Sequence, residues 1–183
     1  LKSKKSNSET DAFWVSTYHM PCAFWNQKIM MIHTALILKQ VKKLAGADPL
    51  ILAGDFNFKP TDCCYELVTT GKCDSSKAEY PSPPVYDPDF NLMTDISSLK
   101  SAAVQFRNSE PLFTNYSWPK PWTPNQKDEP FIGCLDYIFI SDHFQVNDFS
   151  KLYDTVEEAK GPFPNSKEPS DHVLLAATLS IKS

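Results

Sequence analysis

Six polar side chains lie where apolar segments of the chain begin or end, or inside such a segment. Their types are carboxylate, amide and imidazole. Together these groups can hold a divalent cation, donate hydrogen bonds to a phosphate and take a proton from water. A cation held by carboxylates would neutralise the charge that develops on a phosphate under attack. We therefore expect metal-dependent cleavage of a phosphoester. The six residues are His19, Asp55, Asn57, Asp136, Asp171 and His172.

Asp136 is the member of this set that most needs a partner. It lies between Leu135 and Tyr137, inside an apolar segment. A carboxylate buried without a partner costs several kcal/mol, so a cationic or hydrogen-bond-donating group must face it. Among the four histidines, His172 is the obvious candidate. An imidazole oriented in this way can take a proton from water.

Less specific interpretations exist for several of these residues. Asp55 and Asn57 could form only an Asx-type turn after a strand, although the presence of the other polar residues weakens that interpretation. His33 is expected to be a partly exposed residue of a helix, and His143 a residue of a surface loop.

The elements that must position these residues follow from apolar patterning. Strands alternate with helices in the first half of the chain, and strands dominate the second half. This order predicts an α/β layered sandwich of mixed sheets with flanking helices. Strands are expected at 12–18, 49–53, 112–117, 132–140, 143–149 and 172–181, helices at 27–45, 61–70 and near 96–106, and a loop at 156–170.

Two of the expected elements have specific features. The segment 12–18 is aromatic and β-branched, which predicts a buried strand. The helix 27–45 is expected to end at Gly46. The face that we expect it to bury carries the apolar residues Ile29, Ile32, Leu36, Val41 and Leu44.

Composition excludes several classes of protein. The net charge of −4 gives no basic surface for gripping a long duplex, although a metal site can itself attract phosphate. No segment reaches the roughly 18 apolar residues that a membrane span needs, and we expect a cytoplasmic protein with reduced thiols. A zinc site at Cys63-Cys64 and Cys73 is disfavoured because no CxxC or HxxxH motif accompanies these cysteines. The five cysteines are Cys22, Cys63, Cys64, Cys73 and Cys134.

Three ordered motifs resemble signatures of the endonuclease/exonuclease/phosphatase superfamily, whose fold is like that of deoxyribonuclease I. They are Gly54-Asp55-Phe56-Asn57, Leu135-Asp136-Tyr137-Ile138-Phe139 and Ser170-Asp171-His172, and Thr17-Tyr18-His19-Met20 resembles a fourth. The segment Glu110-Pro111-Leu112-Phe113-Thr114-Asn115-Tyr116-Ser117 is similar to one that precedes the second motif in nocturnin and the carbon-catabolite-repression deadenylases.

The resemblance implies a role for each site residue. Asp55 would position the water and contact the metal, and Asp171 would face the metal. Asn57 and His19 would contact the phosphate, and Asn115 would belong to the substrate-binding surface. His172, paired with Asp136, would be the general base or a ligand of the phosphate. The implied ion is Mg²⁺, with Mn²⁺ as an alternative, and the implied substrate is single-stranded RNA or a nucleotide-like phosphoester.

The resemblance covers the C-terminal part of one family domain, which 1–183 would form. The chain begins with Leu1, and family members carry a metal-binding Glu on an N-terminal part that has no counterpart here. We therefore expect a fold that is incomplete at its N-terminal side and inactive alone, with residues 1–10 mobile.

Other functions remain open at this point. The chain could belong to a small-molecule phosphatase, to a phospholipid phosphodiesterase of the same superfamily, or to a non-catalytic interaction module. Trp118, Trp122 and Phe131, which lie among prolines, could stack on bases or pack against one another.

Overall fold

The computed structural model describes residues 12–82, 92, 98–119 and 129–182. Within these residues, the largest sheet has the strand order β1-β2-β6-β3. Strand β2 pairs in parallel with β1, and β6 runs antiparallel to both β2 and β3. The sheet is therefore mixed, as predicted. Its strands are β1 (Trp14–Thr17), β2 (Leu50–Asp55), β6 (Asp136–Ile140) and β3 (Lys100–Ser101).

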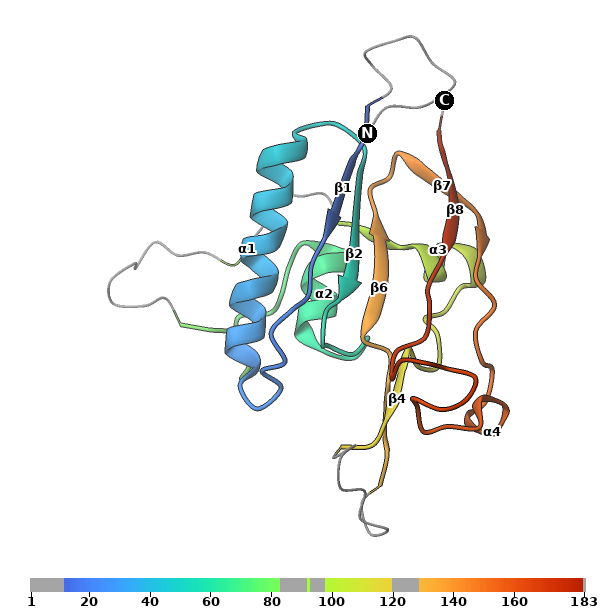
Figure 1. Ribbon diagram of the computed structural model, residues 1–183. Helices are drawn as coiled ribbons and strands as arrows, with labels where there is room; N and C mark the ends of the chain where they lie inside the picture. Colours follow the sequence, from blue (N-terminus) through green and yellow to red (C-terminus); the bar gives the residue numbers. More distant parts are fainter. Residues whose placement is uncertain (1–11, 83–91, 93–97, 120–128, 183) are drawn as a thin grey trace.

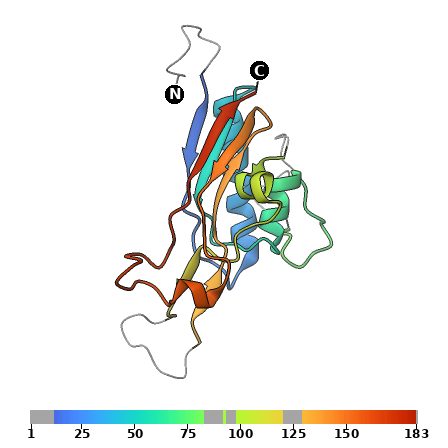
Figure 2. The same ribbon diagram turned by 90° about the vertical axis from the view of Figure 1, so that its right-hand side faces the viewer.

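Layers cover both faces of this sheet. Helices α1 (Gln27–Ala45) and α2 (Cys63–Thr70) lie on one face (Figure 1). On the other face lies the antiparallel pair β7 (Phe144–Phe149) and β8 (Ala177–Ile181), as Figure 2 shows. Helix α3 (Ala102–Arg107) packs against β7. The predicted α/β layered sandwich with flanking helices is confirmed.

Alternation along β2 and β6 divides the interior into two cores. Leu52 and Phe139 are paired in register and fully buried in the core under α1 and α2. Ile51 and Ile140, the next pair, belong to the core under β7 and β8. Burying a side chain of this size contributes about 1.5–3 kcal/mol. The strands are thus held from both sides, and their ends are fixed in place.

Helix α1 has the predicted bounds but a different buried face. It ends at Gly46, which has φ of +59° and whose N–H donates to the carbonyl of Lys42. Ile29, Leu36 and Leu44 are exposed, so the expected face was wrong apart from the buried Val41 and the half-buried Ile32. The side chains that pack into the core are Met30, Met31, Thr34, Ala35, Leu38, Val41 and Ala45.

Several expected strands differ from the structure. Strand β1 is an edge strand, and Trp14 and Val15 are exposed. The segment 132–140 breaks into β5 (Phe131–Gly133), which pairs with β4 (Asn115–Ser117), and β6. The break follows from Leu135, whose backbone binds outside β6: its carbonyl accepts from Phe56 N–H, and its N–H donates to Thr114.

The last third of the chain also departs from expectation. The strand predicted at 172–181 begins only at Ala177, because residues 171–173 pair with β4 instead. The expected loop 156–170 contains the short helix α4 (Val156–Ala159). The helix expected near 96–106 is α3, which begins at Ala102. Residues 1–10, 96, 97 and Trp122 lie outside the described residues.

Two further expectations concern helices and thiols. None of the helices in the described part of the chain is long and apolar enough to cross a membrane. All five cysteines are free thiols, and Cys22 is exposed whereas the other four are buried.

Candidate active site

The sheet brings three polar segments together at one edge. Strand β2 ends at Asp55, which is paired in register with Asp136, the first residue of the antiparallel β6. Beyond β1, the chain stays beside β2, because Met20 N–H donates to the carbonyl of Asp55 at 2.8 Å. His19 therefore lies beside Asp55, with 3.5 Å between its Nε2 and Asp55 Oδ2.

Gly54 makes this approach of β1 to β2 possible. Its φ is +150°, and a Cβ at this position would lie 1.9 Å from the carbonyl oxygen of Tyr18. No side chain fits there without separating the two segments. The glycine of the Gly54-Asp55-Phe56-Asn57 motif thus sets the distance between His19 and Asp55.

Asn57 fixes the orientation of the Asp55 carboxylate. Its backbone N–H donates to Asp55 Oδ1 at 2.9 Å, and its φ of +52° is typical of an Asx-type turn. Its side-chain amide donates to the carbonyl of Met20 at 2.8 Å and, more weakly, to Asp55 Oδ2 at 3.4 Å. The turn interpretation is therefore correct, and the phosphate contact of Asn57 stays a prediction.

Asp136 and His172 form the expected pair. His172 Nδ1 lies 2.8 Å from Asp136 Oδ2. The same carboxylate oxygen accepts a hydrogen bond from the Thr114 hydroxyl at 2.6 Å. Thr114 is fully buried, and its oxygen also accepts from the N–H groups of Leu135 and Asp136. Asp136 is thus held in place by Thr114 and His172. The Nε2 atom of His172, on the other side of the ring, points away from Asp136.

Thr114 is the residue of the site that the sequence analysis missed. It was quoted only as part of the segment Glu110–Ser117, and a threonine next to a strand is common enough to carry no signal. Only its position, directly before Asn115 and close to the break at Leu135 in the fold, reveals its role.

Residues 171–173 reach the site by pairing with β4. Tyr116 N–H donates to the carbonyl of Asp171, and Val173 N–H to the carbonyl of Thr114. The Asp171 carboxylate lies 3.5 Å from the side-chain amide of the buried Asn115. The structure therefore brings Asp171 and Asn115 together, beside His172.

The charges of the site act on one another. Burial raises the pKa of Asp55 above its ordinary value, and the charge of the nearby Asp136 raises it further. The hydrogen bond from the Asn57 N–H and the imidazoles of His172 and His19 lower it by less. The hydrogen bond that His172 Nδ1 donates to Asp136 raises the pKa of His172. His172 Nε2 lies 3.8 Å from Asp55 Oδ2, the oxygen that His19 also faces. A cation bound at Asp55 would offset the unfavourable charge on this half-buried carboxylate.

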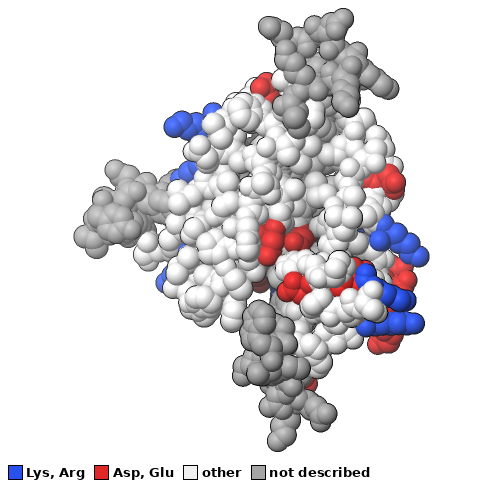
Figure 3. Space-filling view, viewed as in Figure 1, with Lys and Arg blue, Asp and Glu red and all other residues white. Residues whose placement is uncertain are grey.

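Possible metal ligands are grouped here. Donor atoms of Asp55, Asp136 and His172 lie within 4.8 Å of one another, and we call this group the carboxylate–histidine cluster. The two carboxylates of this cluster supply the oxygen ligands that Mg²⁺ and Mn²⁺ prefer. The cluster as found does not include the Asp171 carboxylate. Figure 3 shows acidic side chains near the middle of this face and Lys and Arg toward its margins.

Cys22 and two of the aromatic residues singled out in the sequence have environments that bear on the predicted function. The exposed Cys22 has a raised pKa, caused first by local burial and then by the charge of Asp55. Phe131 is half-buried, with Lys59 Nζ 5.2 Å from its ring centroid, and Trp118 is also half-buried. Both aromatic residues therefore keep part of their surface open, and base stacking by them stays a prediction.

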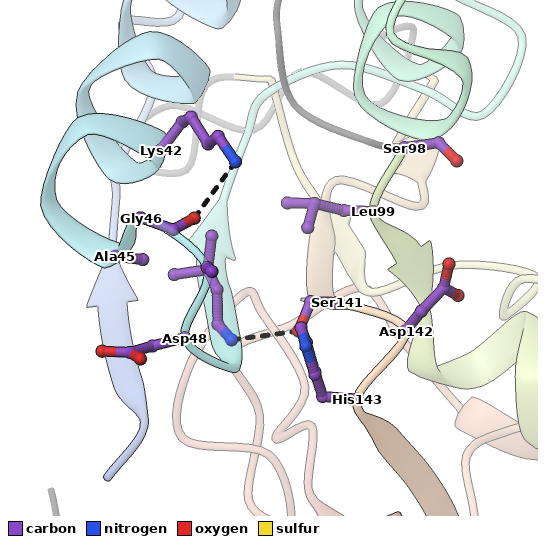
Figure 4. Close-up of a pocket in the computed structure, with 11 residues that line it drawn as sticks. Lys42, Ala45, Gly46, Asp48, Ser98, Leu99, Ser141, Asp142 and His143 are labelled. Atoms are coloured by element: carbon purple, nitrogen blue, oxygen red, sulfur yellow. Dashed lines mark hydrogen bonds between the residues drawn. The ribbon is translucent and has the colours of Figure 1, made fainter. Parts of the chain in front are cut away.

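A hollow of about 300 Å³ lies at the opposite end of the sheet. It is lined by the beginning of β2 at Leu50 and by Ser141, just after β6, together with Lys42 and His143 (Figure 4). His143 is exposed and His33 is a half-buried residue of α1, both as expected. The Nδ1 atom of His33 lies 2.7 Å from the Tyr18 hydroxyl. This hollow is remote from the carboxylate–histidine cluster.

Comparison with known proteins decides the family. A model of the endonuclease/exonuclease/phosphatase family matches residues 31–172. The chain belongs to this family. The match contains the three motifs that carry Asp55, Asp136 and His172, whereas the fourth motif, Thr17-Tyr18-His19-Met20, lies before it.

Individual relatives place the chain near the expected branch. It is 36% identical to the CCR4-Not complex 3′-5′-exoribonuclease subunit Ccr4 of Phaeosphaeria nodorum over 75% of this chain and 21% of that protein. It is 28% identical to human 2′,5′-phosphodiesterase 12 over all of this chain and 28% of that protein. The chain thus spans about a quarter of the length of these relatives.

Solved structures agree on the fold. The human nocturnin catalytic domain matches with a TM-score of 0.58 and 21% identity, over 95% of this chain and 49% of that one. ANGEL2, described as a 2′,3′-cyclic phosphatase, matches with a TM-score of 0.64 and 19% identity, over 92% and 56%. The predicted deoxyribonuclease-I-like architecture is confirmed.

Proposed function

We propose that this chain forms part of a divalent-metal-dependent phosphoesterase that cleaves single-stranded RNA in the manner of a deadenylase. The observation that carries the proposal is the 2.8 Å contact of Asp136 with His172 Nδ1, which leaves Nε2 facing Asp55. The similarity to the Ccr4 exoribonuclease subunit supports RNA as the substrate.

The chemistry assigned to this chain centres on one proton transfer. Asp136 fixes the tautomer of His172 with the proton on Nδ1, so Nε2 is free to accept a proton from the attacking water. Thr114 holds Asp136 in place from the other side. Asp55, oriented by the Asn57 N–H, accepts a hydrogen bond from the same water and aligns it for in-line attack.

The remaining residues act on the phosphate. His19, whose side chain is 78% exposed, is free to donate to a non-bridging oxygen. Asn57 would donate to the same phosphate once its side-chain amide releases its hydrogen bond to the Met20 carbonyl. Asn115, which lies beside Asp171, belongs to the substrate-binding surface.

The carboxylate oxygens of the site fit a hard divalent cation. Burial disfavours the negative charge on Asp55, and a bound cation would offset that charge. Asp55 would hold the ion, with Asp136 or Asp171 beside it. When bound, Mg²⁺ or Mn²⁺ would neutralise charge on the phosphate oxygens. We also propose that these residues are the C-terminal part of one family domain and that a Glu outside them completes the metal site.

The test is cleavage of 5′-labelled oligo(A) by the complete protein in the presence of Mg²⁺. His172→Gln should lower the rate about 100-fold or more, because it removes the general base. His143→Gln is the matched control, since His143 is an exposed histidine at the other end of the sheet, and it should leave the rate unchanged. The 183 residues alone should be inactive.

Two results would reject the proposal. One is absence of cleavage of any phosphoester by the complete protein at saturating Mg²⁺ or Mn²⁺. The other is a His172→Gln or Asp171→Ala variant as active as the parent, because the cleavage would then come from elsewhere.

A second substrate is favoured by one observation, the similarity over the whole chain to human 2′,5′-phosphodiesterase 12. The same residues would then cleave a 2′,5′-linked oligoadenylate. Parallel assays with 3′,5′-linked and 2′,5′-linked oligo(A) of equal length separate the two proposals, and the ratio of kcat/KM values decides between them.

A further inference from the structure

A second group of side chains that could hold a metal ion lies on α2 and in the turn just after it, away from the carboxylate–histidine cluster. The Sγ atoms of Cys63 and Cys73 and a carboxylate oxygen of Glu66 lie within 4.8 Å of one another. We call this group the thiol–carboxylate cluster. Both cysteines are buried, and the Glu66 side chain is 40% exposed. The group therefore has a protected inner side and one side open to water.

The geometry of α2 creates this group. Cys63 is the first residue of the helix, and Glu66 lies three residues later, so both side chains share one face. Gly71, with φ of +73°, ends the helix and turns the chain back. Cys73 follows this turn, and its Sγ atom therefore comes back to lie beside Cys63 and Glu66. From the sequence alone, a zinc site at these cysteines is disfavoured, because the third member of the set is a Glu and not another Cys or His in a recognised motif.

Cys64 and Cys134 do not belong to the group. Cys64 is fully buried in the core under α1 and α2, and its thiol interacts with Thr34 of α1. Cys134 lies at the break between β5 and β6. The ligand set is thus two thiols and one carboxylate.

We propose that Cys63, Cys73 and Glu66 bind Zn²⁺, with water in the fourth position. Zinc prefers four ligands in a tetrahedron, at about 2.3 Å for sulfur and about 2.0–2.2 Å for carboxylate oxygen. Those lengths place ligand atoms about 3.5–3.8 Å apart. The present spacing, within 4.8 Å, needs only small side-chain rotations to reach this.

The surrounding charge favours a cation. Two thiolates and Glu66 would carry three negative charges, against the single positive charge of Lys77, which forms an ion pair with Glu66. Glu79 adds to the negative field at Cys63. Lys77 is 40% exposed, so it can turn into water when Zn²⁺ takes its place at Glu66.

The inferred site has a structural consequence. It would tie the first turn of α2 to the loop after Gly71, and α2 begins only six residues after Asn57. Zinc would therefore stabilise the helix that packs beside the segment carrying Asp55, without taking part in the reaction.

The experiment is a Co²⁺ titration of the reduced, metal-free chain in excess Mg²⁺, which occupies oxygen-rich sites. Tetrahedral Co²⁺ bound to thiolates gives a near-ultraviolet charge-transfer band. We expect this band to saturate at one Co²⁺ per chain and to disappear when Zn²⁺ is added. X-ray absorption of the zinc form should show two sulfur neighbours at about 2.3 Å.

Five variants sharpen the test. Cys63→Ser and Cys73→Ser should each abolish the band. Glu66→Gln should keep it and weaken Zn²⁺ binding more than about tenfold, because one of three protein ligands is lost. Cys22→Ser and Asp55→Asn should bind Co²⁺ like the parent, which separates this site from the carboxylate–histidine cluster.

Three results would overturn the proposal. These are the absence of a thiolate band in the reduced parent, survival of the band in the Cys63→Ser/Cys73→Ser double variant, and a disulfide between the two cysteines in a chain that binds no metal once it is reduced. If the cysteine variants fail to fold, the exposed Glu66→Gln still decides: unchanged zinc affinity would reject the site.

Discussion

On folding, the Asp55 carboxylate loses part of its hydration, and the backbone N–H of Asn57 donates a hydrogen bond to it. Burial raises its pKa, so the folded state holds a proton on Asp55 more strongly than the unfolded state does. Stability then falls as the pH rises through the raised pKa. At neutral pH and without metal, the charge on Asp55 destabilises the fold.

Removing that charge should stabilise the metal-free protein. Asp55→Asn keeps the oxygen that accepts from Asn57, and it should raise the free energy of unfolding by up to about 1 kcal/mol at neutral pH. Urea denaturation in EDTA measures this. Asp171→Asn, on an exposed side chain, is the control. A destabilised Asp55→Asn protein would contradict the argument.

His172 should give the opposite kind of pH dependence. Its pKa is raised above 6.5 by Asp136, so the stabilisation from the pair is fully present below pH 6.5 and is lost as the pH rises through the folded pKa. In EDTA, Asp136→Asn should remove about 1 kcal/mol or less of this pH-dependent part, because the imidazole remains partly open to water. Urea denaturation over a pH series measures the slope, and equal slopes in parent and variant would contradict this.

At the scale of elements, Gly54 controls how closely β1 approaches the site. Gly54→Ala would place a methyl group against the Tyr18 carbonyl, and it should cost about 2–4 kcal/mol of stability and most of the activity. Thermal unfolding and the oligo(A) assay measure the two effects.

Gly46→Ala is the matched control for that substitution. Gly46 also has a positive φ, of +59°, but a Cβ there would meet nothing within 4 Å. It should therefore cost only about 1–2 kcal/mol and leave the rate of the folded protein unchanged. Equal losses in the two variants would show that strain at positive φ, and not the contact with Tyr18, dominates.

The elements show where sequence reasoning succeeds. The bounds of α1 and the position of β2 follow from a long apolar segment, a stop at Gly46 and a short apolar strand. The buried face of α1 did not follow, because apolar residues occur on nearly all its sides. Packing against β2 and α2 chose Met30 and Leu38 over Ile29 and Leu36.

The site shows the same division. Asp55, Asp136 and His172 were predicted because each lies beside an apolar segment that must bury or present it. Thr114 and the break at Leu135 were not predicted, because both depend on hydrogen bonds between segments that are far apart in the sequence, from Leu135 to Thr114 and from Phe56 to Leu135. Such contacts leave no periodic pattern in the sequence.

At the scale of the whole molecule, the two cores meet at strands β2 and β6, whose ends carry opposed carboxylates. Like charges directly opposite across a sheet are destabilising. Mg²⁺ at about 100 times its Kd should therefore stabilise the complete protein by about 2.7 kcal/mol. Thermal unfolding with Mg²⁺ and with EDTA measures this, and Asp55→Asn should lose most of the difference. An equal response of the variant would place the ion elsewhere.

The exposed thiol of Cys22 offers an intrinsic reporter of these events. The other four cysteines are buried, so a maleimide dye should attach to Cys22 first. The negative charge of Asp55 contributes to the raised pKa of this thiol. A cation at Asp55 would offset that charge, increase the thiolate fraction and accelerate labelling. The labelling rate would then follow cation occupancy in solution, without any substrate, and Asp55→Asn should label quickly whether or not Mg²⁺ is present.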